Sequence, residues 1–285
     1  MGAATSENPM ISCLKNVRRM DHDRFLTILA APFEVRFKLV ALYAFNAELA
    51  RVRETVSEPM LGQIRLQWWR ETIAALEQSD IRGHEVAAAL SESFNEQTIY
   101  PGLLSLIDAR ERDLEDEPFA DISALETYCE ETSSRLIALA AEAISGQKTT
   151  RVGQVIRSAG IAYALTGLLR ALPSHASQGR LYLPLNLLAQ YDVDPHQIFA
   201  GEMSGGLRKI ISDLVNLAQS HLVDARSKSY LVEKNMLPAF WPASLCDVYL
   251  DKMIAQDFNP FRDPVEHPAF LRQLRLSRRK LFGSF

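Results

Sequence analysis

Apolar residues recur at steps of three and four along much of this chain, which is the period of an α-helix. Between residues 34 and 56, one such stripe runs through Val35, Leu39, Leu42, Phe45, Leu49 and Val52. No stretch shows the sustained alternation of apolar and polar residues, bounded by turn residues, that indicates a half-buried strand. The pattern predicts an all-α protein, with helices over 34–56, 60–76, 82–97, 101–116, 121–145, 152–171, 206–232 and 243–256.

Short breaks separate the predicted helices, at positions such as Gly146, Pro173, Pro195 and Pro238. No Ser/Gly-rich linker, internal repeat or low-complexity block divides the chain. The sequence therefore predicts one helical domain over residues 13–262. A flexible N-terminus, 1–12, precedes it, and a basic amphipathic tail, 263–285, follows it.

Composition limits the function classes. The 285 residues carry a net charge of −4, which gives no general case for binding nucleic acid. Three scattered cysteines without a CxxC pair fit a reducing compartment. The N-terminus lacks the patterns of a secretory signal and of a mitochondrial presequence, and no apolar run near 18 residues suggests a membrane span. We expect a bacterial cytoplasmic protein; a processed protein of the mitochondrial matrix would look similar.

Two helical segments carry the most specific pattern. They are Tyr43–Glu54 (YAFNAELARVRE) and Tyr163–His175 (YALTGLLRALPSH), and the second continues into Gly179–Pro184 (GRLYLP). With supporting strips such as Arg65–Arg70 (RLQWWR), this frame resembles the squalene/phytoene synthases, which condense two prenyl diphosphates head to head. The resemblance covers nearly the whole chain and implies an isoprenoid-synthase helical bundle around a central cavity.

The resemblance also implies a Mg²⁺-diphosphate site, and this chain departs from it. Carboxylates four apart on a helix share a face, so two facing helices can hold a metal cluster. The three aspartate positions of the first family motif hold Ala50, Arg51 and Glu54 here. The polar ligands of the second motif become Gly167, Ala171 and His175. We therefore expect no catalytic residue, no metal and no cofactor, with Mg²⁺ needed only if the chain is an enzyme after all.

Small residues replace the lost ligands in a regular pattern. Gly160, Ala164, Gly167 and Ala171 share one helical face, and Tyr43, Ala47 and Ala50 lie on the helix that faces it in the family. Tyr43, Ala47, Ala50, Gly160, Ala164 and Gly167 are the residues we expect to line the cavity. The cavity is either narrowed by close helix approach or left as an apolar tunnel. The alternative is ordinary packing of small residues between helices.

Four arginines are candidates for binding an anion or a diphosphate without metal, because arginine makes bidentate phosphate contacts. They are Arg51, Arg65, Arg170 and Arg180. For the arginines around the first motif, the alternative is pairing on the surface with Glu48, Glu54 and Glu71.

Within the superfamily, the first motif is most similar to the branch of mitochondrial complex I assembly factors and their alphaproteobacterial relatives. Ala44–Val52 (AFNAELARV) and the strip up to Trp69 carry that similarity. It implies an accessory or assembly factor for NADH:ubiquinone oxidoreductase, whose partners are subunits or assembly intermediates of the complex. Two alternatives stay open: a divergent prenyltransferase, and a non-catalytic isoprenoid-binding carrier.

The end of the chain is basic and amphipathic. Residues 270–285 contain five cations, no acid and interleaved leucines and phenylalanines. Such a segment can lie on an anionic membrane surface, where each nearby cation adds about 1 kcal/mol. We expect membrane or partner contact here. The alternatives are a terminal helix docked on the domain and a tail disordered in solution.

Overall fold

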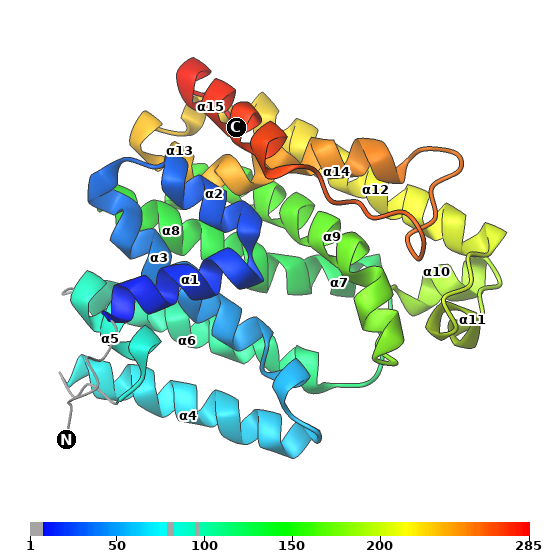
Figure 1. Ribbon diagram of the computed structural model, residues 1–285, viewed down its shortest axis with the longest axis horizontal. Coiled ribbons are helices and arrows are strands. Elements are labelled where there is room, and N and C mark those ends of the chain that lie inside the picture. Colours follow the sequence, from blue (N-terminus) through cyan, green and yellow to red (C-terminus); the bar gives the residue numbers. More distant parts are fainter. Residues whose placement is uncertain (1–7, 79–82, 95–96) are drawn as a thin grey trace. The chain divides into compact units, whose positions relative to one another are not determined.

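The computed structural model describes residues 8–78, 83–94 and 97–285. Every regular element in these residues is helical and none is a strand, which confirms the all-α prediction (Figure 1). Residue contacts group into two compact units: 1–114 with 139–148, and 115–138 with 149–285. Each unit joins segments that are distant in sequence, so no linker separates them, and for this reason composition gave no sign of a division.

The first unit is built from the N-terminal helices. Asn8 caps its first helix by accepting a hydrogen bond of 2.8 Å from the Met10 amide. That helix begins at Pro9, inside the predicted flexible segment 1–12, and residues 1–7 of that segment lie outside the described residues. The helices are α1 (Pro9–Met20), α2 (His22–Ala30), α3 (Phe33–Ala50), α4 (Pro59–Glu77), α5 (Glu85–Ser93) and α6 (Tyr100–Ala109).

Helix α3 is the core of this unit. All residues from Ala41 to Ala47 are buried, because the helix packs against α1, α2 and α5. Phe45 meets Trp69 of α4 edge to face, with ring centroids 5.2 Å apart. A helix that is apolar on all sides is typical of a buried position.

The second unit is built around α9 (Gly153–Ser177) and α12 (Gly205–Ser227), which pack along each other. A single π-helical turn, Glu130–Ser134, also packs against α9. The other helices are α7 (Ile122–Cys129), α10 (Leu185–Gln190), α11 (Pro195–Phe199), α13 (Leu237–Phe240), α14 (Cys246–Met253) and α15 (Ala269–Phe282), while α8 (Arg135–Ser145) begins here and ends in the first unit.

Several predicted boundaries were wrong; the helices predicted over 101–116 and 206–232, for example, end at Ala109 and Ser227. The helix predicted over 34–56 ends at Ala50, and a 3₁₀ turn, Arg53–Thr55, follows it. The break predicted at Pro173 does not occur, because α9 continues to Ser177. A proline inside a helix loses one backbone hydrogen bond. Burial of Leu172 and Ala176 on either side favours continuation of the helix here.

One described helix is long and apolar enough to cross a membrane by length and composition, Thr150–Ser177, with a mean hydropathy of 1.3. No such run was expected from the sequence. Within its most apolar window, 61% of the residues are buried, as expected of a core helix.

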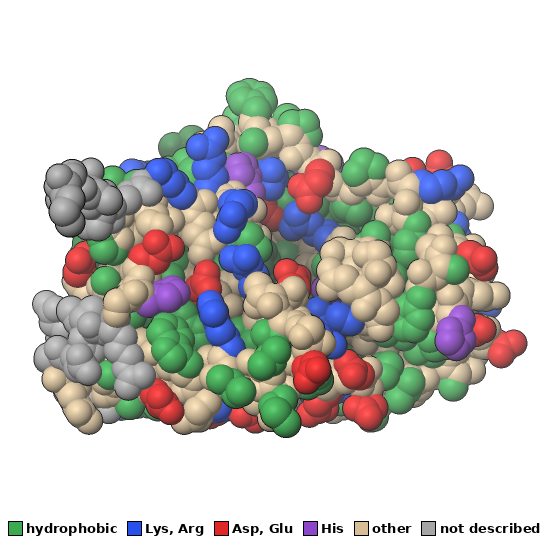
Figure 2. Space-filling model, turned by 60° about the horizontal axis from the view of Figure 1, so that its bottom comes forward, with side chains coloured by type: hydrophobic (Ala, Val, Ile, Leu, Met, Phe, Trp, Pro, Cys, Tyr) green, Lys and Arg blue, Asp and Glu red, His purple; other side chains and the backbone are tan. Residues whose placement is uncertain are grey.

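The face shown in Figure 2 carries Lys and Arg side chains among acidic and apolar ones.

Candidate functional site

The first group of predicted site residues lies at the C-terminal end of α3. Tyr43, Ala47 and Ala50 are four and three residues apart, so they share one face of the helix. Tyr43 and Ala47 are buried, and Ala50 is partly exposed. Burial raises the pKa of the Tyr43 hydroxyl to about 12, although the Arg24 guanidinium lies 5.4 Å from its ring centroid. This face is therefore apolar apart from a phenol that stays protonated at neutral pH.

The carboxylate of Glu48 faces both arginines that were predicted to bind an anion in this unit. Its oxygens lie 3.8 Å from Arg51 and 3.6 Å from Arg65, and Asn16 donates a hydrogen bond of 3.0 Å to it. The Arg65 side chain is 48% exposed. For these two arginines the structure shows the alternative, pairing with an acid. Binding of a diphosphate by them stays a prediction.

Glu54, the acid that aligns with the first motif, is exposed in the 3₁₀ turn after α3. Arg70, in the strip that supports the resemblance, pairs with Asp108 and Glu111 at 2.8 and 2.5 Å. Asp108 and Glu111 lie close to Arg70 because α4 packs against α6 and against the turn after it. Helical spacing within one segment did not indicate them.

The second group lies on α9, in the second unit. Gly160 packs so tightly against the π-helical turn that an added Cβ would lie 2.2 to 2.5 Å from atoms of Ser134. Close packing therefore accounts for the glycine at this position. Apart from its chain neighbours and the backbone of its own helix, no described atom lies within 4 Å of a Cβ added at Gly167, and Ala164 and Ala171 are partly exposed. For Ala164 and Gly167, the role of lining a cavity stays a prediction.

The charged and aromatic residues of this group contact neighbours within the same unit. Arg170 donates a hydrogen bond of 2.8 Å to Glu266, and its guanidinium lies 3.9 Å from the ring centroid of Tyr249. Arg180 donates to the Tyr182 hydroxyl at 2.9 Å. The ring of His175 packs on the same tyrosine, with centroids 4.5 Å apart.

Two voids lie within single units. The one in the second unit has a volume of about 10 Å³ and includes His175, Tyr182 and Leu165 in its lining, so it holds one water at most. The one in the first unit is open and measures about 610 Å³. Phe37, Lys38, Glu92 and Glu142 are among the residues that line it, and none of the predicted site residues does.

The residues at the motif positions do not fit a Mg²⁺ ion. Mg²⁺ takes oxygen ligands in octahedral geometry, whereas Ala50, Gly167 and Ala171 offer no side-chain oxygen and Arg51 is a cation. Among the described residues, no three His, Cys, Asp or Glu side chains are grouped closely enough to hold a metal. The expectation of no cofactor stays a prediction.

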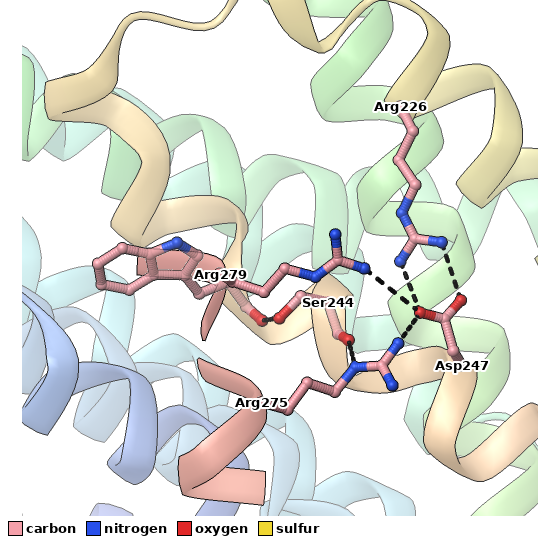
Figure 3. A network of polar contacts seen from close by, with 6 residues as sticks. Arg226, Ser244, Asp247, Arg275 and Arg279 are labelled. Carbon is pink, nitrogen blue, oxygen red and sulfur yellow. Dashed lines mark hydrogen bonds and ion pairs between the residues drawn. The ribbon is translucent and has the colours of Figure 1, made fainter. Parts of the chain in front are cut away.

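One polar cluster, in the second unit, was not predicted from the sequence (Figure 3). Arg226 of α12 donates to both carboxylate oxygens of Asp247 at 2.9 and 2.8 Å. Arg275 also donates to Asp247 and to the Ser244 carbonyl, and Arg279 lies 3.8 Å from the same carboxylate. The only sequence signal was the spacing of Arg275 and Arg279, which puts both on one face of a helix.

A family model described as squalene/phytoene synthase matches residues 17–280. The rat and human proteins named complex I assembly factor 6 are 31% and 30% identical to this chain, each over 93% of it and 79% of their own length. Phytoene synthase 2 of Zea mays is 30% identical over only 41% of this chain and 29% of its own.

A crystal structure of a dehydrosqualene synthase superposes with a TM-score of 0.76, covering 96% of each chain at 15% identity. At this identity the likeness shows the fold alone. The family model and the relatives together confirm the resemblance read from the sequence. The chain belongs to the squalene/phytoene synthase family, on the branch that contains the complex I assembly factors.

Proposed function

We propose that this protein is an accessory or assembly factor for respiratory complex I and that it does not transfer prenyl groups. The observation that carries this proposal is the 31% identity to rat complex I assembly factor 6, which extends over 93% of the chain. Its partners are subunits or assembly intermediates of the complex. It acts in the bacterial cytoplasm at the inner face of the membrane, or in the mitochondrial matrix if the source is eukaryotic and the chain is processed.

The motif positions support the non-catalytic part of the proposal. Departure of a diphosphate from an allylic carbon is helped by divalent cations that neutralise the developing charge. Ala50, Arg51, Gly167 and Ala171 provide no oxygen ligand for such ions. Arg51 and Arg65 face Glu48, and Arg170 pairs with Glu266, so these arginines have acidic neighbours within the protein.

Peripheral membrane contact through residues 270–285 is part of the proposal. An assembly factor for a membrane complex needs access to subunits at the membrane surface. The five cations of this segment and its interleaved apolar residues favour attachment to an anionic membrane.

A divergent prenyltransferase is the second candidate, favoured by the partial match to phytoene synthase and by the fold. It predicts Mg²⁺-dependent consumption of farnesyl or geranylgeranyl diphosphate, with Glu54 required. A carrier would instead co-purify with a quinone or a polyprenol. The assembly role predicts neither result.

Deletion of the gene, followed by measurement of assembled complex I on native gels and of NADH:ubiquinone oxidoreductase activity, tests the proposal. We expect both to fall together and to be restored by wild-type protein and by Glu54→Ala equally well. Normal complex I levels in the deletion strain would contradict the assembly role. Failure of Glu54→Ala alone, with normal protein levels, would favour the enzyme.

A further inference from the structure

Helix α15 is amphipathic. A helix that packs on a protein normally turns its apolar face inward, whereas α15 turns its arginines inward. Its inward side carries three arginines and a single leucine: Arg272 and Leu276 are buried, and Arg275 and Arg279 face Asp247. Its outward side carries five apolar side chains that are between 49% and 81% exposed, Phe270, Leu271, Leu274, Leu281 and Phe282, together with the exposed polar residues Gln273, Ser277, Arg278 and Lys280.

Charge pairing explains why the arginines point inward. The carboxylate of Asp247 on α14 attracts Arg275 and Arg279, and the Ser244 carbonyl accepts a further hydrogen bond of 2.9 Å from Arg275 (Figure 3). At the start of the helix, Arg272 donates to the Tyr249 hydroxyl at 3.3 Å. Three of the five cations in the segment therefore hold the helix on its own unit.

The end of the helix is also fixed. Gly283 adopts a φ of 61°, and the Ser284 amide bonds back to the Arg279 carbonyl at 3.0 Å, the arrangement of a Schellman cap. The chain then turns inward, and the buried Phe285 packs on Phe240 with ring centroids 4.9 Å apart. With both ends held, rotation of α15 to bury its apolar side would break these contacts.

We propose that the outward face of α15 inserts into the surface of an anionic membrane. Phe270, Leu271, Leu274, Leu281 and Phe282 enter the boundary between headgroups and acyl chains, while Arg278 and Lys280 contact lipid phosphates. This inference rests on the membrane contact included in the proposed function. It gives that contact a different driving force, apolar insertion instead of charge attraction. Apolar insertion provides most of the affinity, and the arginines toward Asp247 act as tethers.

Charge favours a lipid surface over an acidic protein groove as the occupant. The whole chain carries −4, yet the exposed residues of α15 include two cations, Arg278 and Lys280, and no acid. Arg278 lies within the apolar face of the helix, and its guanidinium lies 5.9 Å from the Phe282 ring centroid. Bulky apolar side chains with flanking cations are typical of helices that lie in a membrane interface.

Co-sedimentation with vesicles of phosphatidylcholine and about one fifth phosphatidylglycerol provides the test. We expect the wild type to bind and Phe270→Ser with Leu274→Ser to lower the partition coefficient at least tenfold, since each buried side chain of this size contributes on the order of a tenfold factor. The matched control is Met60→Ser with Ile64→Ser on α4, which removes two apolar side chains of similar exposure and spacing. We expect it to bind like the wild type.

Salt separates insertion from surface attraction. Because apolar insertion provides most of the affinity in this proposal, raising KCl to about 0.5 M should lower binding less than tenfold. Binding abolished by salt, Phe270→Ser with Leu274→Ser equal to wild type, an equal loss in the α4 control, or a wild type that does not bind would each overturn the proposal.

A fluorophore placed on the helix reports its orientation even if a variant binds poorly. All three native cysteines, Cys13, Cys129 and Cys246, are buried, so an added surface cysteine can be labelled alone. An environment-sensitive dye at Leu281→Cys should shift to the blue when vesicles are added, while dye at Met60→Cys should not. No shift at residue 281 would overturn the inserted orientation.

Complementation distinguishes failure of this inference from failure of the proposed function. If the wild type restores complex I in the deletion strain but does not bind vesicles, the membrane inference fails and the assembly role stands. If it binds vesicles as expected and complex I is unaffected by deletion, the assembly role fails and the insertion stands.

Discussion

Glu48 in the first unit and Asp247 in the second are both carboxylates that face more than one arginine, yet their geometry differs. Glu48 lies 3.6 and 3.8 Å from Arg65 and Arg51, beyond ordinary hydrogen-bond distance. Asp247 receives two hydrogen bonds of 2.8 and 2.9 Å from Arg226 and further contacts from Arg275 and Arg279. The arginines around Glu48 were singled out from the family motifs, whereas the cluster around Asp247 was not predicted. The closeness of an arginine to a family motif therefore does not indicate how much it contributes to stability.

The largest effect in this comparison should follow loss of the carboxylate at Asp247. Asp247→Ala leaves Arg226, Arg275 and Arg279 facing one another without a counter-charge. Breaking a fully buried pair costs 3–5 kcal/mol. The side chains of this cluster are 22% to 32% exposed. We therefore expect Asp247→Ala to lower the free energy of unfolding by about 2 kcal/mol, measured by urea unfolding.

A second variant shows whether like charges cause that loss. Adding Arg275→Ala to Asp247→Ala removes one of the three cations and should recover part of the stability. If Asp247→Ala unfolds at the same urea concentration as wild type, the cluster does not stabilise the unit.

Acid should weaken the Asp247 cluster selectively. Burial alone would raise the pKa of Asp247, but hydrogen bonds from Arg226 and the charges of the three arginines outweigh it and lower the pKa. A carboxyl whose pKa is lowered on folding contributes stability above its unfolded pKa, about 3.9. That contribution is lost as the pH falls through the still lower folded pKa.

Unfolding experiments between pH 6 and pH 2 can measure this contribution. The stability difference between wild type and Asp247→Asn should be constant above about pH 5 and should shrink below about pH 4. A difference that does not change with pH would show that the charge of Asp247 contributes nothing.

The smallest effect is expected at Glu48. Glu48→Ala removes two ion pairs at 3.6 and 3.8 Å, one of them to an arginine that is 48% exposed. The Glu48 side chain is only 14% exposed, but its two arginines are 30% and 48% exposed and lie beyond hydrogen-bond distance. Such long pairs contribute about 0.5 kcal/mol, and the hydrogen bond from Asn16 adds to this. We expect a loss below about 1 kcal/mol in urea unfolding. A loss as large as that of Asp247→Ala would remove the contrast between the two clusters.

The sequence predicted much of the fold because helical periodicity is a local property. The stripe from Val35 to Leu49 and the absence of alternating runs were enough to predict an all-α protein. The boundary at Ala50 and the helix through Pro173 were missed because tertiary packing decides whether a helix continues.

The site was less predictable because sequence shows which residues share a helix face but not which face points inward. For α15 the sequence showed an amphipathic basic segment, but not that Asp247 would turn its arginines inward. Arg275 and Asp247 are 28 residues apart and belong to different helices, so no local pattern joins them. In contrast, the absence of side-chain oxygens at Ala50, Gly167 and Ala171 is plain in the sequence, and their place in the metal-binding motifs is what the resemblance implies.

The central claim is that this synthase frame no longer supports metal-diphosphate chemistry. Calorimetric titration with a non-hydrolysable farnesyl diphosphate analogue, with and without Mg²⁺, tests it most directly. We predict no binding that depends on Mg²⁺, in the wild type or in Glu54→Ala. Micromolar binding that requires Mg²⁺ and is lost in Glu54→Ala would contradict the claim and identify the protein as a prenyltransferase.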